Sequence, residues 1–105
     1  MALLLGLMLA APAPAKQATR NEVTIKDLRY SPAVLKIRAG EKVVWINQDD
    51  SDHTVVSDDP DDKDFRSDNL GHGDTFSHTF KKAGKFPYHC KYHPRMKGII
   101  IVSAR

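Results

Sequence analysis

The sequence of 105 residues contains one cysteine, Cys90, and this scarcity excludes several kinds of protein. One cysteine cannot form a disulfide within the chain. Structural zinc sites usually take two to four thiolates among their ligands, and covalent haem attachment needs a second cysteine directly before a histidine. The lone thiol therefore needs another explanation.

The chain also lacks the ~20 consecutive apolar residues that a membrane-spanning helix needs. Its most apolar stretch, MALLLGLMLAAPAPA, is shorter and ends in Ala-Pro-Ala. We interpret residues 1–15 as a secretory signal peptide cut after Ala15, although the Lys or Arg that usually opens such a leader is missing. The alternatives are a buried first strand and a membrane anchor that is not cut.

If the leader is cleaved, residues 16–105 remain as a single domain. We expect this domain in the periplasm or another exported compartment, with no stable insertion in a membrane. Cleavage would remove Met1 and Met8 and leave Met96 as the only methionine. A free thiol in an oxidising compartment is prone to oxidation and cross-linking. A bound metal would protect Cys90 there.

No segment shows helical periodicity, and short apolar or alternating segments are separated by polar and glycine-containing breaks. The longest break, residues 57–73, is rich in Asp and is expected to be a loop. The pattern predicts an all-β fold, a Greek-key β-sandwich of about seven to eight strands. The seven strands that it indicates are residues 22–28, 33–40, 42–47, 53–56, 74–80, 85–90 and 98–102.

The segment YHCKYHPRMKG places Cys90, His93 and Met96 together at the end of an expected strand. Because side chains alternate along a strand, His89 points away from the face of Cys90, whereas a loop can turn His93 back towards it. One thiolate, two imidazoles and a distant thioether form the ligand set of a blue-copper electron-transfer site. The best candidate for the second imidazole is His53, which follows the strand VVWIN and a short loop.

VVWIN, the histidine that follows it and FSHTFKKAGKFPYHCKYHPRMKGIIIV resemble the cupredoxin (blue copper) family. The short Cys-x-x-His-x-x-Met loop is most similar to that of the amicyanins, within the plastocyanin and pseudoazurin group. The resemblance implies one copper ion per chain, Cu(I) or Cu(II), bound by His53, Cys90 and His93 with Met96 axial. It also implies that His93 reaches the surface through an apolar patch and is the exit for the electron.

Some residues depart from the family pattern or invite another interpretation. Thr54 stands where these proteins often have Asn, although its backbone N–H could still bond the thiolate. We favour a hydrogen-bonded core or edge histidine for His78 over a second metal ligand, and a solvated loop residue for His72 over a weak metal site. The run SDDPDDKDF fits no register of a calcium-binding loop and is interpreted as a solvated acidic loop.

Charge is unevenly distributed along the chain. Residues 49–74 contain ten acidic and two basic side chains, whereas residues 75–105 contain seven basic and no acidic ones. Lys91, Arg95 and Lys97 alternate with the proposed ligands, so the metal end is expected to have a basic rim. We therefore expect a monomer whose redox partners present an acidic docking surface. Neither the broad basic surface nor the stacked aromatics of nucleic-acid binding are evident.

Two functional classes remain. The first, which we favour, is a soluble carrier that keeps its copper while passing single electrons between redox partners. The second is a periplasmic protein that binds or delivers copper as cargo. An enzyme is not expected, because four protein ligands leave no open position for a substrate.

Overall fold

The computed structural model describes residues 21–105, so the predicted signal peptide, residues 1–15, lies outside the described residues. All regular secondary structure of the described part is β, and the expected all-β fold is confirmed. The strands are β1 (Asn21–Lys26), β2 (Arg29–Ser31), β3 (Val34–Arg38), β4 (Glu41–Asn47), β5 (Val56–Ser57), β6 (Thr75–Phe80), β7 (Gly84–His89) and β8 (Lys97–Ser103).

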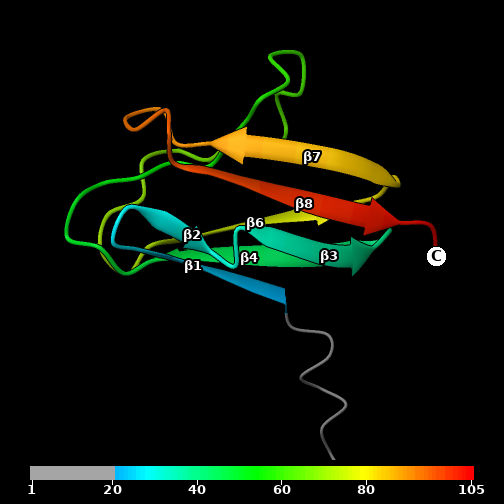
Figure 1. Ribbon diagram of the computed structural model, residues 1–105, viewed down its shortest axis with the longest axis horizontal. Helices are drawn as coiled ribbons and strands as arrows, with labels where there is room; N and C mark the ends of the chain where they lie inside the picture. The colour runs from blue at the N-terminus through cyan, green and yellow to red at the C-terminus, as the bar shows by residue number, and fades with distance from the viewer. Residues whose placement is uncertain (1–20) are drawn as a thin grey trace, which may run out of the picture.

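The strands form two sheets of four that pack against each other as a sandwich (Figure 1). The strand order is β2-β1-β4-β6 in one sheet and β3-β8-β7-β5 in the other. Most neighbours are antiparallel, but β1 pairs with β4 and β3 pairs with β8 in parallel. Parallel neighbours need a crossover connection, and the chain passes through the opposite sheet between the two members of each such pair.

Aromatic side chains fill the core between the sheets. Trp45 and Tyr88 are fully buried, and their rings meet edge to face with centroids 5.5 Å apart. Phe65, from the long loop after β5, is also fully buried and lies 5.6 Å from the Trp45 ring. Because large aromatic residues contribute much of the burial energy of a core, this cluster fixes how the two sheets face each other.

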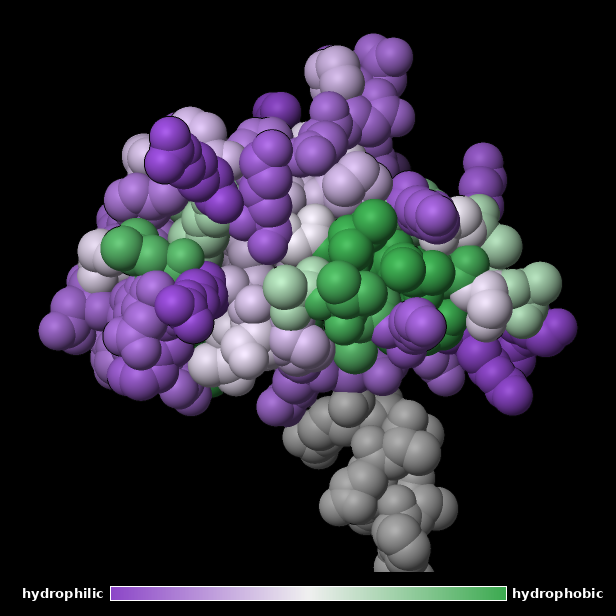
Figure 2. All heavy atoms as spheres, viewed as in Figure 1, coloured by the Kyte–Doolittle hydropathy of each residue, from purple (hydrophilic) through white to green (hydrophobic). Residues whose placement is uncertain are grey.

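The outward face of the sheet at β3 and β8 carries apolar side chains. Val34 of β3 is 53% exposed and pairs with Ile99 of β8, whose neighbour on the same face, Ile101, is half-buried. Figure 2 shows an apolar area on this face, surrounded by hydrophilic side chains. The run GIIIV therefore contributes to the core with only every second side chain.

The structure differs from the sequence prediction at the first strand. The expected strand over residues 22–28 ends at Lys26, and Asp27 and Leu28 form a turn with φ angles of 54° and 60°. Two successive residues with positive φ are typical of a tight hairpin turn, which here leads into the unpredicted strand β2. Alternation alone does not reveal such a turn, because neither residue is glycine.

Replacement of Gly98 by alanine is expected to destabilise the fold. Gly98 lies on β8 opposite Tyr88, and an added Cβ would clash with the Tyr88 ring and hydroxyl. Since both are buried, we expect unfolding to become easier by about 1–3 kcal/mol, the usual cost of overpacking. Chemical denaturation measures this loss. Gly71→Ala, whose Cβ meets nothing closer than 3.5 Å, is the control, and equal losses in both variants would contradict the prediction.

Candidate metal centre

The four sequence-predicted site residues come from two loops at the same end of the sandwich (Figure 1). His53 lies between β4 and β5, whereas Cys90, His93 and Met96 lie between β7 and β8. His53 and Cys90 are fully buried and Met96 is 4% exposed, while His93 is half-buried. The end of the strand scaffold therefore gathers a thiol, a thioether and two imidazoles.

Distances within the group show how the side chains lie. The Nδ1 atom of His53 is 3.8 Å from Cys90 Sγ, and the ring centroids of His53 and His93 are 5.3 Å apart. The loop is closed by two backbone bonds, from Cys90 N–H to the Met96 carbonyl at 3.1 Å and from Met96 N–H to the His93 carbonyl at 2.8 Å. Across residues 21–105 no three His, Cys, Asp or Glu side chains form a group that could hold a metal ion. Copper coordination by these four residues thus stays a prediction.

The sulfur of Cys90 lies among hydrogen-bond donors. Thr54 directs its backbone N–H to Sγ at 3.5 Å and its hydroxyl to the same atom at 3.9 Å. Burial raises the pKa of the Cys90 thiol, but hydrogen bonds from the Thr54 backbone, the His53 side chain and the backbone of Tyr92 and His93 together hold the pKa below its usual value. The site therefore favours a thiolate, the form that binds metals.

The carboxylate of Asp49 orients His53, a contact that the sequence analysis did not identify. Asp49 Oδ2 lies 2.8 Å from His53 Nε2 and also accepts the Leu28 N–H at 3.0 Å, while Oδ1 accepts the Asp27 N–H at 2.7 Å. An ionised carboxylate can only accept hydrogen bonds, so the Nε2 proton points to Asp49 and Nδ1 faces the sulfur. Carboxylate–histidine pairs of this kind commonly fix the ring of a metal ligand.

Two further residues hold the loop that carries His53. Asn47, buried at the end of β4, donates its amide to the carbonyls of Ser51 and Leu70 at 3.0 and 2.8 Å. The hydroxyl of Tyr30 on β2 donates to the Thr54 carbonyl at 2.6 Å, and burial raises the Tyr30 pKa far above its usual value. A neutral tyrosine is thereby kept as a permanent donor beside the site.

The remaining histidines lie outside this group. His89 points away from Cys90, as alternation predicts, and its Nδ1 is 2.6 Å from Asp58 Oδ1 on the sheet surface. His78 is half-buried and stacks on Phe65 with ring centroids 5.1 Å apart, so it packs as an aromatic residue. His72 is exposed in its loop, as expected, and its Nδ1 is 3.2 Å from the Asp49 carbonyl.

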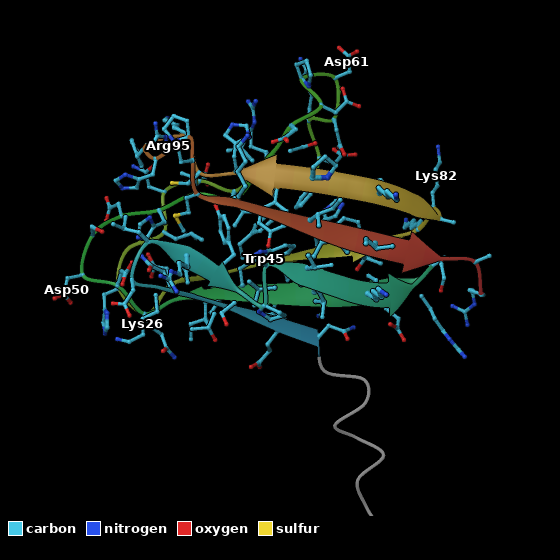
Figure 3. The ribbon with its side chains drawn as sticks, viewed as in Figure 1. Lys26, Trp45, Asp50, Asp61, Lys82 and Arg95 are labelled. Carbon is cyan, nitrogen blue, oxygen red and sulfur yellow. The ribbon has the colours of Figure 1, made fainter. Side chains whose placement is uncertain are left out.

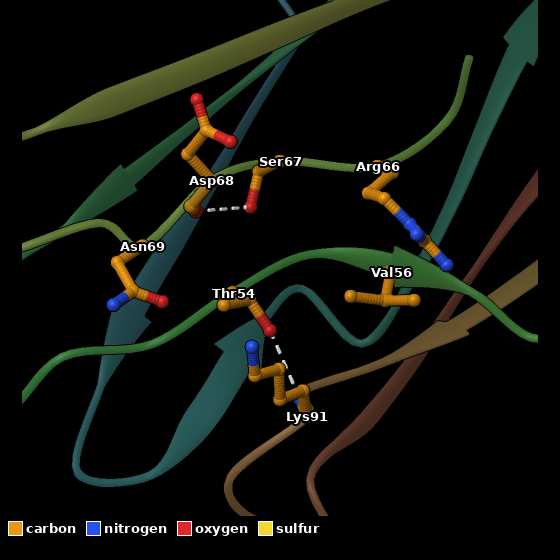
Figure 4. Close-up of a pocket in the computed structure, with 7 residues that line it drawn as sticks. All are labelled: Thr54, Val56, Arg66, Ser67, Asp68, Asn69 and Lys91. Atoms are coloured by element: carbon orange, nitrogen blue, oxygen red, sulfur yellow. Dashed lines mark hydrogen bonds between the residues drawn. The ribbon is translucent and has the colours of Figure 1, made fainter. Parts of the chain in front are cut away.

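An open hollow of about 670 Å³ lies beside Thr54, the residue whose N–H and hydroxyl face Cys90 Sγ (Figure 4). Inside it the Lys91 backbone N–H donates to the Thr54 hydroxyl at 2.9 Å, which joins the two site loops. The lining residues are Thr54, Val56, Arg66, Ser67, Asp68, Asn69 and Lys91. The hollow therefore brings solvent close to Thr54, which is itself only 1% exposed, but not to the buried sulfur.

Charges of both signs surround the candidate centre. Lys91, Arg95 and Lys97 are exposed, as the sequence predicts for a basic rim. Figure 3 shows, however, that Asp50 lies at the same end of the molecule as Arg95. The β4–β5 loop therefore adds an acidic margin beside the basic side chains of residues 91–97, and Figure 3 places Lys26 at this end as well.

In residues 21–105 the structure contains no helix with the length and apolar character needed to cross a membrane.

Comparisons with known proteins match nearly the whole chain. The model of the cupredoxin-like domain family matches residues 1–102. Amicyanin of Paracoccus versutus is 33% identical over 86 residues, which cover 76% of this chain and 62% of that protein. The chain therefore spans less than two thirds of the length of this relative.

Solved structures show the same architecture. A purple cupredoxin from Nitrosopumilus maritimus is similar with a TM-score of 0.73 and 32% identity, over 79% of this chain and 99% of that one. The Cu(I) form of a methionine-to-alanine mutant of amicyanin is similar with a TM-score of 0.73 and 27% identity, over 81% and 83% of the two chains.

Proposed function

Because the chain belongs to the cupredoxin family, we propose that it is a small blue copper protein that passes single electrons between redox partners. His53, Cys90, His93 and Met96 would hold one copper ion. The observation that carries the proposal is the buried Cys90 thiol facing an imidazole nitrogen at 3.8 Å. The periplasm or another exported compartment is the proposed location.

The donor set fits copper in its chemistry. A single thiolate with two imidazoles and a thioether is the set preferred by blue-copper sites, whereas structural zinc usually takes more thiolates. The sulfur accepts hydrogen bonds from backbone N–H groups, and within residues 21–105 no carboxylate is hydrogen-bonded to it. Copper, when bound, supplies a one-electron change between Cu(I) and Cu(II).

The protein's own residues would keep this change fast by preventing rearrangement. His53 is fixed through Nε2 by Asp49, and the loop around Cys90 is closed by its backbone bond to Met96. Burial of His53, Cys90 and Met96 excludes water from these side chains. A rigid, dry set of ligands suits a carrier better than a protein that must release its metal.

His93 is the proposed route for the electron to a partner. It is half-buried and shares a shallow surface hollow with Tyr92, Pro94 and Arg95, and Tyr92 is 43% exposed. A partner that docks over this loop would come close to a ligand without entering the protein. Four protein ligands leave no position for a substrate, so we propose a carrier and not an enzyme.

Repeated redox cycling of the copper-loaded protein tests this function. We expect ascorbate to bleach the visible colour and ferricyanide to restore it over many cycles, with the copper still bound after gel filtration with a moderate Cu(I) chelator. The rigid ligand loops are the reason for retention. Stoichiometric loss of copper to the chelator in the reduced state would instead identify a delivery protein. Absence of any intense visible band would contradict a blue copper site altogether.

A further inference from the structure

We propose that the Thr54 hydroxyl is a positioning group that donates a second hydrogen bond to Cys90 Sγ and thereby raises the reduction potential. This inference rests on the proposed blue-copper function. Thr54 stands where proteins of the resembling family often have Asn, so the role belongs to this chain's own side chain. The Thr54 hydroxyl is a second donor to the sulfur. From the sequence, only the backbone N–H of Thr54 was expected to donate.

The two donors come from one residue and converge on one atom. The Thr54 backbone N–H lies 3.5 Å from Sγ and the hydroxyl oxygen 3.9 Å from it. Thr54 is 1% exposed and Cys90 is fully buried. Because water does not reach the sulfur, the charge on a thiolate depends on these protein donors, and each of them counts for more than it would in solvent.

The direction of the hydroxyl bond follows from its other partner. The Lys91 backbone N–H donates to the Thr54 hydroxyl oxygen at 2.9 Å (Figure 4). A backbone N–H can only donate, so it occupies a lone pair of that oxygen and leaves the hydroxyl hydrogen available. In the described part of the chain, Sγ is the acceptor towards which that hydroxyl points. The Lys91 N–H therefore orients the Thr54 hydroxyl so that it donates to Cys90, the residue directly before Lys91 in the sequence.

A donor at the sulfur changes the balance between the two oxidation states. Hydrogen bonds around the cysteine sulfur tune the potential of blue-copper sites. They withdraw electron density that the thiolate would otherwise give to the metal, and Cu(II) depends on that density more than Cu(I) does. Removal of the hydroxyl should therefore lower the potential and move the sulfur-to-copper absorption band to longer wavelength.

The central experiment compares Thr54→Val, which removes the hydroxyl at nearly constant shape, with Thr54→Ser, which keeps it. We expect Thr54→Val to shift the electron-exchange equilibrium with a fixed redox dye by roughly fivefold to tenfold towards the oxidised protein, the effect of about one typical hydrogen bond. The band should move to longer wavelength in parallel. Thr54→Ser should restore both properties towards those of the original protein.

Ser67→Ala is the matched control, because it removes a neighbouring hydroxyl that braces the same segment. Ser67 Oγ accepts the Val55 N–H at 2.8 Å and donates to the Asp68 carbonyl at 2.8 Å, with no bond to sulfur. We expect it to lower stability without moving the potential or the band. Equal shifts in Ser67→Ala and Thr54→Val would show that a loosened segment is responsible, and the proposal would be wrong.

Measurements on the copper-free protein keep the test independent of metal binding. Loss of the Thr54 hydroxyl should speed hydrogen exchange of the Lys91 amide, whose acceptor is removed, and Thr54→Ala repeats the test if valine prevents folding. A visible band that neither Thr54→Val nor Thr54→Ala shifts, with an unchanged potential, would overturn this inference alone. A protein with no intense band in any variant would overturn the proposed function instead.

Discussion

Replacement of Cys90 by serine is expected to abolish the intense visible absorption of the copper-loaded protein, lowering it by roughly tenfold or more. The band arises from charge transfer between a thiolate and Cu(II), and Cys90 is the only cysteine of the chain. Serine keeps the shape of the side chain and can still hold copper weakly with the histidines. The expected product is therefore a pale copper protein, measured by visible absorption and paramagnetic resonance.

The histidines provide a graded control for the same experiment. His53→Ala should perturb the spectrum strongly, because it removes the imidazole whose Nδ1 lies 3.8 Å from Cys90 Sγ. His72→Ala should leave it unchanged, since His72 is exposed and its ring contacts the Asp49 carbonyl and the Asp50 carboxylate rather than a proposed ligand. An undiminished band in Cys90→Ser would mean that the absorption has another origin, and the ligand assignment would be wrong.

Sequence spacing places Cys90, His93 and Met96 in one loop, because they lie within seven residues between the end of one expected strand and the start of the next. It also predicted correctly that His89 points away from Cys90, since strand alternation depends on local geometry alone. His53 needed a further argument, as nothing local links it to a residue 37 positions later. The structure places the two in contact because β5 pairs with β7.

The contacts that tune the site were less predictable. Asp49 stands four residues before His53, which is a weak local signal, but its role depends on the turn at Asp27 and Leu28, whose backbone also bonds it. That turn was hidden inside an expected strand. The parallel pairing of β1 with β4 was likewise not predictable, because alternation shows which side of a strand is buried and not which strand lies beside it.

Charge reversal in the β7–β8 loop is expected to slow electron transfer to an acidic partner. Lys91 and Arg95 are exposed on either side of His93, the proposed exit for the electron. A local positive field steers an acidic partner to this end and raises the association rate more than the final affinity. For Lys91→Glu combined with Arg95→Glu, we expect the second-order rate at low salt to fall by about tenfold or more. Stopped-flow reduction by an acidic redox protein measures this rate.

The matched control is Lys81→Glu combined with Lys82→Glu, which changes the net charge equally at the opposite end of the molecule. Figure 3 shows Lys82 at one end of the sandwich and Arg95 at the other. If steering is local, this control should change the rate little, and the difference between the two variants should shrink as salt shortens the Debye length to about 8 Å at 0.15 M. A basic redox protein should react faster with the loop variant. Equal slowing by both variants would mean that net charge alone governs association, and the acidic margin at Asp50 would then offset the basic loop.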